Sequence, residues 1–172
     1  MKSLSKSEER QLINLLNKLN PGVLPRDIFF ALIRLVVSAT YLVVPIFEDK
    51  NGKIKVYLIK RETDDPHWPG LLHIPGKIII PTDTTIKDTY LRLLKTEVPE
   101  LKIKNNPIFC GYVFDEIPRG KEISLINFVV LKEKPKSGFL YSADKLPKNT
   151  ISTEVKRIKM AVKHYKLTKT KN

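Results

Sequence analysis

The stretch that decides the fold is LHIPGKIIIPTDTTIKDTYLRLLKTEVPEL, residues 72–101. Its first half is apolar and turns at Pro75 and Gly76. Its second half carries apolar residues every three or four positions, which predicts an amphipathic helix. Residues 83–85, DTT, precede the periodic run as N-cap residues do, and Pro99 ends it. We therefore expect a loop, a short strand, a turn and a helix whose apolar positions are Ile86, Tyr90, Leu93, Leu94 and Val98.

Glu97 lies on the apolar stripe of this expected helix. At about 100° per residue, it falls among Ile86, Tyr90 and Leu93. A carboxylate in such a place costs free energy unless something pairs with it. Two interpretations stay open: the last helical turn frays and Glu97 is solvated, or Glu97 has a partner inside the protein.

The same stretch resembles the Nudix box, the loop–helix–loop motif G-x5-E-x7-R-E-U-x-E-E-x-G-U of the Nudix hydrolases, where U is apolar. That box usually follows a Pro-Gly pair, which is present here at Pro75 and Gly76. Residues 92–97, RLLKTE, lie over R-E-U-x-E-E, so that Arg92, Leu94 and Glu97 match. The resemblance implies that Arg92 and Glu97 are the catalytic residues.

The box departs from the family pattern at five positions. Lys77 stands for its first glycine and Asp83 for its first glutamate, one residue too far from Arg92. The other departures are Leu93 and Thr96, which replace two acids, and Pro99, which replaces the second glycine.

The flanks of the stretch follow the order that is common in Nudix chains. Residues 41–48 and 53–61 alternate as two strands of a hairpin, joined by a turn that contains Asn51 and Gly52. Trp68 follows in a Pro- and Gly-rich loop, where we expect it to anchor the loop rather than stack on a base. Residues 142–147 look like the segment that leads into the family's last helix.

The resemblance covers residues 38–167 and implies an α+β fold, a Nudix-like α/β/α sandwich with a mixed sheet. Residues 1–37 are then an N-terminal two-helix extension, and residues 168–172 are a basic tail. The first helix begins at a capping box formed by Ser5 and Glu8. The second helix has Ile28, Phe29, Leu32 and Leu35 on one face. The extension is expected to pack on the core or on a twin subunit, which makes a homodimer conceivable.

Two further strands, residues 108–114 and 123–131, and a final helix complete the expected domain. Ser152 or Thr153 is the expected cap of that helix. Its apolar side comprises Val155, Ile158, Ala161, Val162 and Tyr165.

Nudix hydrolases cleave nucleoside diphosphates linked to another moiety, using Mg2+ or Mn2+ held by carboxylates of the box helix. By this resemblance the metal ligands are Glu97, Asp83 and a downstream carboxylate, for which Asp115, Glu116 and Glu122 are the candidates and Glu116 is carried forward. Oxygen ligands of this kind suit Mg2+. The order R-L-x-x-x-E is similar to the branch that hydrolyses GDP-mannose. Arg61, Lys77 and Arg119 are expected to bind the phosphates of the substrate.

Three functions follow from these observations. The first is a divergent Mg2+-dependent Nudix hydrolase, a pyrophosphohydrolase or nucleotide-sugar hydrolase, acting on a phosphorylated small molecule. The second is a catalytically silent Nudix fold that binds a nucleotide or a partner, because two box acids are missing. The third, and least favoured, is an RNA-binding module, motivated by the basic last helix.

Composition narrows the class of protein further. The chain has 172 residues and a net charge of +13, which favours anionic partners. Its hydrophobic fraction of 42% is enough for a core. Cys110 is the only cysteine, which excludes a disulfide within the chain and a zinc site built on cysteines. The apolar runs are too short to span a membrane and the charged N-terminus is unlike a signal peptide, so we expect a cytoplasmic protein.

Overall fold

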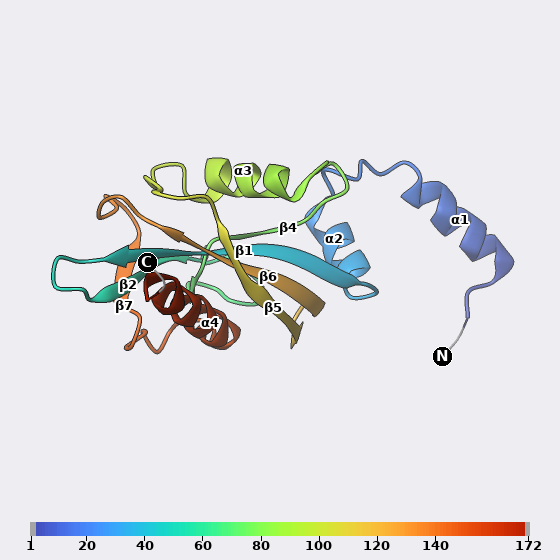
Figure 1. Ribbon diagram of the computed structural model, residues 1–172. Helices are drawn as coiled ribbons and strands as arrows, with labels where there is room; N and C mark the ends of the chain where they lie inside the picture. Colours follow the sequence, from blue (N-terminus) through green and yellow to red (C-terminus); the bar gives the residue numbers. More distant parts are fainter. Residues whose placement is uncertain (1–2, 171–172) are drawn as a thin grey trace.

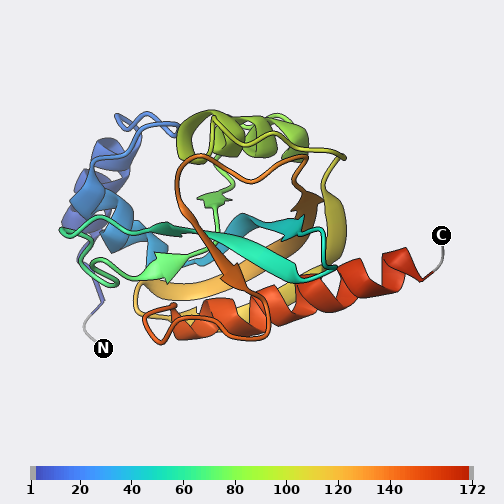
Figure 2. The same ribbon diagram turned by 90° about the vertical axis from the view of Figure 1, so that its left-hand side faces the viewer.

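The computed structural model describes residues 3–170 and places a mixed β-sheet between two helices (Figures 1 and 2). Along the chain the helices are α1 (Lys6–Leu16), α2 (Arg26–Ile33), α3 (Ile86–Glu97) and α4 (Ser152–Lys169). The strands are β1 (Val37–Glu48), β2 (Ile54–Lys60), β3 (Leu72–His73), β4 (Gly76–Ile78), β5 (Ile108–Ile117), β6 (Gly120–Val130) and β7 (Phe139–Ser142). The expected α+β sandwich with a mixed sheet is confirmed.

β1 is the central strand, and its two edges are paired differently. On one edge β6 runs parallel to it over ten residue pairs, from Val37 to Ile46. On the other edge two antiparallel strands share its length: β4 pairs with the first half and β2 with the second. Between them, the amide of Val43 donates to the carbonyl oxygen of Pro75 at 3.0 Å. The sheet therefore divides at the middle of β1, and the cavity described below lies at this division.

Alternate residues of β1 supply two separate hydrophobic clusters because side chains along a strand point to opposite faces. Leu42, Val44 and Ile46 pack with α4 on one face, while Tyr41 and Val43 pack with α3 on the other. Full burial of one such aliphatic side chain contributes about 1.5–3 kcal/mol. Both faces of the sheet are thereby covered, as Figure 2 shows.

The helix that the sequence predicts, with apolar positions from Ile86 to Val98, is present as α3, which ends at Glu97 and has Val98 as its C-cap. Thr85 is its N-cap, and the predicted cap is extended by a capping box with Asp88. The predicted cap of α4 is wrong: Ile151 occupies the N-cap position and makes no side-chain cap, and Ser152 is already the first helical residue. The free first turn of α4 instead carries the acidic Glu154.

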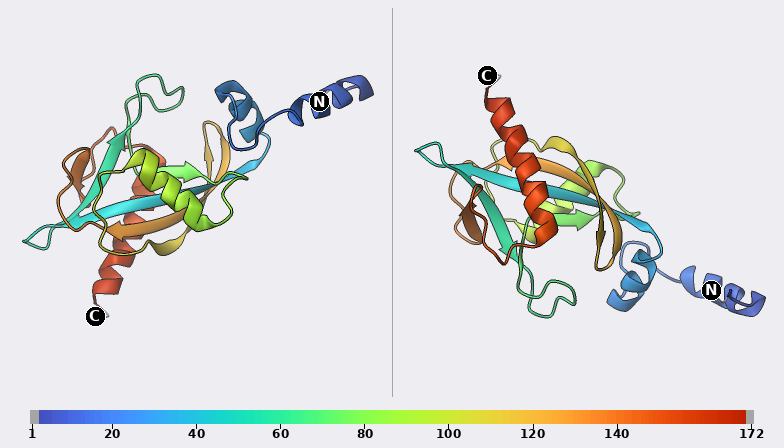
Figure 3. Two further views of the ribbon diagram at one scale, coloured as in Figure 1. Left: turned by 90° about the horizontal axis from the view of Figure 1, so that it is seen from above. Right: turned by 90° about the horizontal axis from the view of Figure 1, so that it is seen from below.

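The two N-terminal helices differ in how they contact the rest of the protein. The predicted capping box of Ser5 and Glu8 is confirmed, but α1 buries none of its residues and projects away from the sheet (Figures 1 and 3). α2 lies against the start of β1 and is tied to the loop after β2 by an ion pair of Arg26 with Asp64 at 3.2 Å. It ends at Ile33, so the prediction that Leu35 belongs to its packed face is wrong.

The entrance to α4 is hydrogen-bonded to β3. The amide of Leu72 donates to the carbonyl oxygen of Asn149 at 2.9 Å, and the amide of Ile151 donates to the carbonyl oxygen of Leu72 at 2.9 Å. These bonds form a short parallel bridge between Leu72 and Thr150. The loop that precedes β3 and the first turn of α4 therefore share one backbone link.

The C-terminal end of α4 is bound to β1. The ammonium of Lys169 pairs with the Glu48 carboxylate at 2.6 Å, and the Tyr165 hydroxyl donates to the same carboxylate at 2.5 Å. Residues 168 and 169, assigned to the tail by the sequence, continue the helix, while residues 171 and 172 lie outside the described range. Within residues 3–170, no helix has the length and apolar character needed to cross a bilayer.

Candidate functional site

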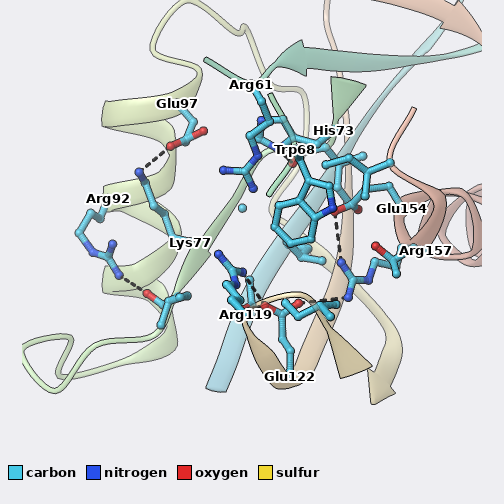
Figure 4. Close-up of a pocket in the computed structure, with 18 of the residues that line it drawn as sticks. Arg61, Trp68, His73, Lys77, Arg92, Glu97, Arg119, Glu122, Glu154 and Arg157 are labelled. Atoms are coloured by element: carbon cyan, nitrogen blue, oxygen red, sulfur yellow. Dashed lines mark hydrogen bonds and ion pairs between the residues drawn. The ribbon is translucent and has the colours of Figure 1, made fainter. Parts of the chain in front are cut away.

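A cavity of about 270 Å³ opens where the sheet divides beside β1 (Figure 4). It is lined by residues of β1, β4, α3, the loop after β2, the β5–β6 turn and the first turns of α4. Five cationic and three acidic side chains line it: Arg61, Lys77, Arg92, Arg119 and Arg157, with Glu97, Glu122 and Glu154.

Gly76 allows β4 to approach β1 closely enough to form one wall. A Cβ atom at this position would lie 2.2 Å from Cδ2 of Leu42, which is far inside van der Waals contact. Any other residue would force the buried Leu42 side chain to shift. The close approach sets the neighbouring Lys77 against α3.

The α3 end of the cavity, formed by Lys77, Arg92 and Glu97, contains a single carboxylate. The ammonium of Lys77 lies 2.5 Å from Oε1 of Glu97, with 26% and 21% of the two side chains exposed. The question left open by the sequence is thus answered: Glu97 stays on the folded helix and has a partner from the adjacent strand.

Arg92 holds the loop before α3 in place. Its Nε and Nη2 donate to the two oxygens of Asp83 at 3.1 and 2.6 Å, and Nη2 also donates to the carbonyl oxygen of Ile78 at 2.7 Å. Asp83 also accepts hydrogen bonds from the Thr89 hydroxyl and the Ile80 amide. The Arg92 guanidinium lowers the pKa of Asp83 to about 2. The pair of Arg92 and Asp83 thus holds the loop after β4 against α3.

Two arginines and a tryptophan occupy the middle of the cavity. The guanidinium carbons of Arg61 and Arg119 each lie 5.6 Å from the centre of the Trp68 ring, within cation–π distance. Among the described residues, the Arg61 guanidinium makes no hydrogen bond, and its ion pair with Asp65 is long at 3.6 Å. Arg61 therefore keeps its donors free for a ligand.

The α4 end of the cavity, formed by Glu122, Glu154 and Arg157, is a buried ionic cluster. Only 3% of Arg157 is exposed. Its Nη1 donates to Oε1 of Glu154 at 3.2 Å, and its Nη2 donates to Glu122 at 3.1 Å and to Asp115 at 3.2 Å. Figure 4 shows the two glutamates on either side of this guanidinium. Asp115 belongs to the cluster without lining the cavity, and Lys156 binds its outer oxygen.

Glu122 and Glu154 have opposite shifts in pKa. Burial alone would raise the pKa of Glu122, but the Arg119 charge and the hydrogen bonds from Thr40, Arg119 and Ser124 lower it below its usual range. Burial raises the pKa of Glu154 to about 7, and the nearby charge of Arg157 only partly offsets that effect. Oε2 of Glu154 has no hydrogen-bond partner among the described residues.

His73 is a neutral side chain in the cavity wall. It is buried, and its Nδ1 lies 2.8 Å from the carbonyl oxygen of Ile74, to which it donates as the neutral tautomer. Burial and the nearby Arg61 charge lower its pKa to about 3. The imidazole therefore adds no positive charge at neutral pH.

The donor set does not fit the Mg2+ or Mn2+ ion that the resemblance implies. Leu93 and Thr96 occupy two of the acidic box positions: Leu93 is buried in the core, and the Thr96 hydroxyl donates to the carbonyl oxygen of Arg92. Glu97 is already neutralised by Lys77. Among residues 3–170, no group of three or more Asp, Glu, His or Cys residues converges as a metal cage would.

The structure brings most of the predicted site residues together. Arg61, Lys77, Arg92, Glu97 and Arg119 all line this one cavity, although they come from four separate segments of the chain.

Two of the predicted metal ligands lie elsewhere. Asp83 is outside the cavity wall and spends both oxygens on Arg92 and neighbouring donors. Glu116 is exposed on β5, opposite Lys121 of β6, because the alternation of the strand turns it away from the side of Asp115. The carboxylate that this hairpin does deliver to the cavity is Glu122.

Sequence reasoning missed the contribution of α4. Glu154 and Arg157 fall on the same helical stripe as Ile158, Ala161 and Tyr165, and all five are buried. Charged residues at spacings of three and four along an apolar stripe are the signal that also singled out Glu97. That signal marked the α4 end of the cavity equally well.

Comparison with solved structures identifies the architecture. The Nudix domain of Shewanella oneidensis NrtR, crystallised with ADP ribose, superimposes with a TM-score of 0.56 and 16% identity, over 94% of this chain and 99% of that one. A MutT/Nudix family protein from Listeria innocua gives a TM-score of 0.60 and 15% identity, over 78% and 98%. The C-terminal domain of mouse MUTYH, crystallised with human PCNA, gives 0.54 and 18%, over 76% and 90%.

Sequence comparisons find no such likeness. No protein-family model and no curated protein sequence matches the chain. The likeness therefore lies in the arrangement of helices and strands. The chain has the Nudix fold.

Proposed function

We propose that this Nudix-fold protein binds a diphosphate-containing small molecule in the cavity and does not hydrolyse it. The observation that carries the proposal is the ion pair of Lys77 with Glu97. It occupies the one box carboxylate in a cavity whose lining has more cations than acids. A site of this kind attracts phosphate but lacks the cluster of oxygen ligands that metal-dependent hydrolysis needs.

Arg61, Lys77 and Arg119 are the proposed phosphate ligands. A guanidinium presents several donors in one plane and matches two phosphate oxygens at once. Arg61 enters binding with its donors free, and Trp68 lies within cation–π distance of both arginines. Such preorganisation reduces the entropy lost when the ligand is bound.

The diphosphate class is supported by the fold and by one neighbour. ADP ribose, the molecule in the NrtR crystal structure, contains a diphosphate. The nucleoside diphosphate derivative that the resemblance implies would present the same diphosphate group to the cavity of this chain.

A Mg2+-dependent hydrolase is the second candidate, and the place of Glu97 in the cavity favours it. In that case Lys77 would release Glu97 when substrate and metal enter. RNA binding has less support, because two lysines of the basic last helix, Lys156 and Lys169, are paired with Asp115 and Glu48.

Thermal unfolding with inorganic pyrophosphate or ADP, in Mg2+ or in EDTA, tests the proposal. We expect stabilisation in both conditions, of about 2.7 kcal/mol at a ligand concentration of 100 times Kd. Arg61→Ala should abolish most of the ligand-induced shift. Arg26→Ala is the matched control, since Arg26 is exposed and outside the cavity.

Phosphorus NMR of the same mixtures separates the two candidates. An unchanged diphosphate spectrum after long incubation is the expected result. Metal-dependent release of phosphate that Glu97→Gln abolishes would instead establish the hydrolase. No stabilisation by either ligand at millimolar concentration would overturn the binding proposal.

A further inference from the structure

Glu154 is a buried carboxylate with one unused oxygen in the wall of the cavity. Only 5% of the residue is exposed, and Oε1 accepts its one hydrogen bond, from Arg157 at 3.2 Å. Oε2 has no partner in the described part of the chain. A buried carboxylate oxygen without a donor costs free energy, so a group that supplies the donor is bound favourably.

Glu122, the neighbouring acid, provides the contrast. Its Oε1 accepts from Ser124 and Arg157, and its Oε2 accepts from Thr40 and Arg119, at distances of 2.7–3.1 Å. Glu122 is thus saturated by the protein and has a structural role. At the α4 end of the cavity, Glu154 is therefore the carboxylate with an oxygen, Oε2, available to accept a hydrogen bond from a ligand.

The geometry points to a sugar-recognition subsite: we infer that Oε2 of Glu154 accepts a hydrogen bond from a hydroxyl of a ribose carried by the bound diphosphate. This inference rests on the proposed function, because the phosphates must first be held by Arg61, Lys77 and Arg119. Figure 4 shows Glu154 on the α4 side of the cavity, opposite the pair of Lys77 and Glu97. Arg61 and Arg119, two of the three proposed phosphate ligands, lie between these two ends beside Trp68.

The size and the lining of the cavity agree with this ligand. The volume of about 270 Å³ lies just below the usual range of about 300–1,000 Å³ for ligand pockets, which limits the enclosed part of the ligand to a small unit such as a diphosphate and one sugar ring. The group nearest the phosphates is then the sugar, while a base would extend toward the opening. Glu154 lines the cavity, and Oε2 is the oxygen that no described residue binds.

The test compares ADP with 2′,3′-dideoxy-ADP, which differs only in the ribose hydroxyls, by titration calorimetry on the full chain. The titration is run at pH 8, above the pKa of about 7 to which burial raises Glu154, so that the carboxylate is ionised. We expect ADP to bind about tenfold more tightly to the wild type, as for a charge-assisted hydrogen bond. In Glu154→Gln the preference should fall to about twofold or less, since the neutral amide oxygen is a weaker acceptor.

Asp115→Asn is the matched control. Asp115 binds Arg157 at 3.2 Å as Glu154 does, but it does not line the cavity, so the preference for ADP should persist. Equal affinities of the wild type for the two nucleotides would overturn the sugar subsite without any variant. A preference that survives Glu154→Gln, or that Asp115→Asn also removes, would overturn the role of Glu154. Failure of inorganic pyrophosphate to bind the wild type would reject the proposed function itself.

Discussion

At the α3 end of the cavity a single carboxylate, Glu97, meets Lys77 with about a quarter of each side chain exposed. At the α4 end, Arg157 meets three acids, with 3% of its side chain exposed. The first pair lies in the segment that resembles a catalytic motif, and the second lies in a helix without any motif. The segment that resembles a motif therefore marks one wall of the cavity, while the more deeply buried ionic groups lie on the opposite wall, in and around α4.

The largest expected effect is the loss of the buried arginine. Arg157→Met leaves Asp115, Glu122 and Glu154 buried with fewer cations, and removal of one partner of a buried ion pair costs about 3–5 kcal/mol. Urea denaturation of the variant should show this loss. The control Arg26→Met breaks an exposed pair and should cost less than about 1 kcal/mol. Equal losses in the two variants would remove the distinction between the two kinds of pair.

An intermediate effect is expected from pH at Glu154. Burial raises its pKa to about 7 in the folded protein from an ordinary value of 4.5, so between these pH values the folded state keeps a proton that the unfolded state has lost. The stability of the wild type should therefore fall relative to that of Glu154→Gln as pH rises from 5 to 8, by up to about 3 kcal/mol.

The groups that face Glu154 do not reverse this direction. The charges of Arg157 on its own helix and of Arg61 from the loop after β2 lower the pKa of Glu154, and the charge of Glu122 on β6 raises it, but burial outweighs all three. Chemical denaturation at several pH values measures the difference. A stability difference that does not change with pH would show that Glu154 is ionised throughout.

The smallest effect is expected at the α3 end. Lys77→Met should cost less than about 1 kcal/mol, because Glu97 is exposed enough for water to solvate it when the lysine is gone. Thermal unfolding without ligand, beside Lys102→Met as a control for an exposed pair with Glu133, measures this cost. A loss of several kcal/mol would mean that both ends of the cavity hold the fold together.

Local rules predicted much of the fold. Helical spacing and cap residues predicted α3, and the turn at Asn51 and Gly52 predicted the β1–β2 hairpin, where Gly52 has φ of +74°. These features depend on residues close in sequence. Two of the five cations that line the cavity, Arg61 and Arg119, were named only through the family resemblance.

The rest depends on pairing that local patterns do not fix. Choosing between Glu116 and Glu122 required the register of the β5–β6 hairpin, where Glu122 lies opposite Asp115 and Glu116 lies opposite Lys121. A shift of one residue would exchange the two faces. Glu154 was not named from the sequence; it stands in the first turn of α4, where acidic residues are favoured by the helix dipole alone. Only the packing of α4 on the sheet makes it a buried residue.

The backbone bridge between Leu72 and Thr150 couples the loop before β3 to the first turn of α4, which both line the cavity. Arg61 and Trp68 precede Leu72 in the sequence, and Glu154 and Arg157 follow Thr150 in α4. A displacement of the tryptophan loop that pulls on Leu72 would also strain the amide of Ile151, one residue before α4. Opening of the cavity at the Trp68 loop would then also disturb the start of α4, so that ligand entry and the position of Glu154 are coupled.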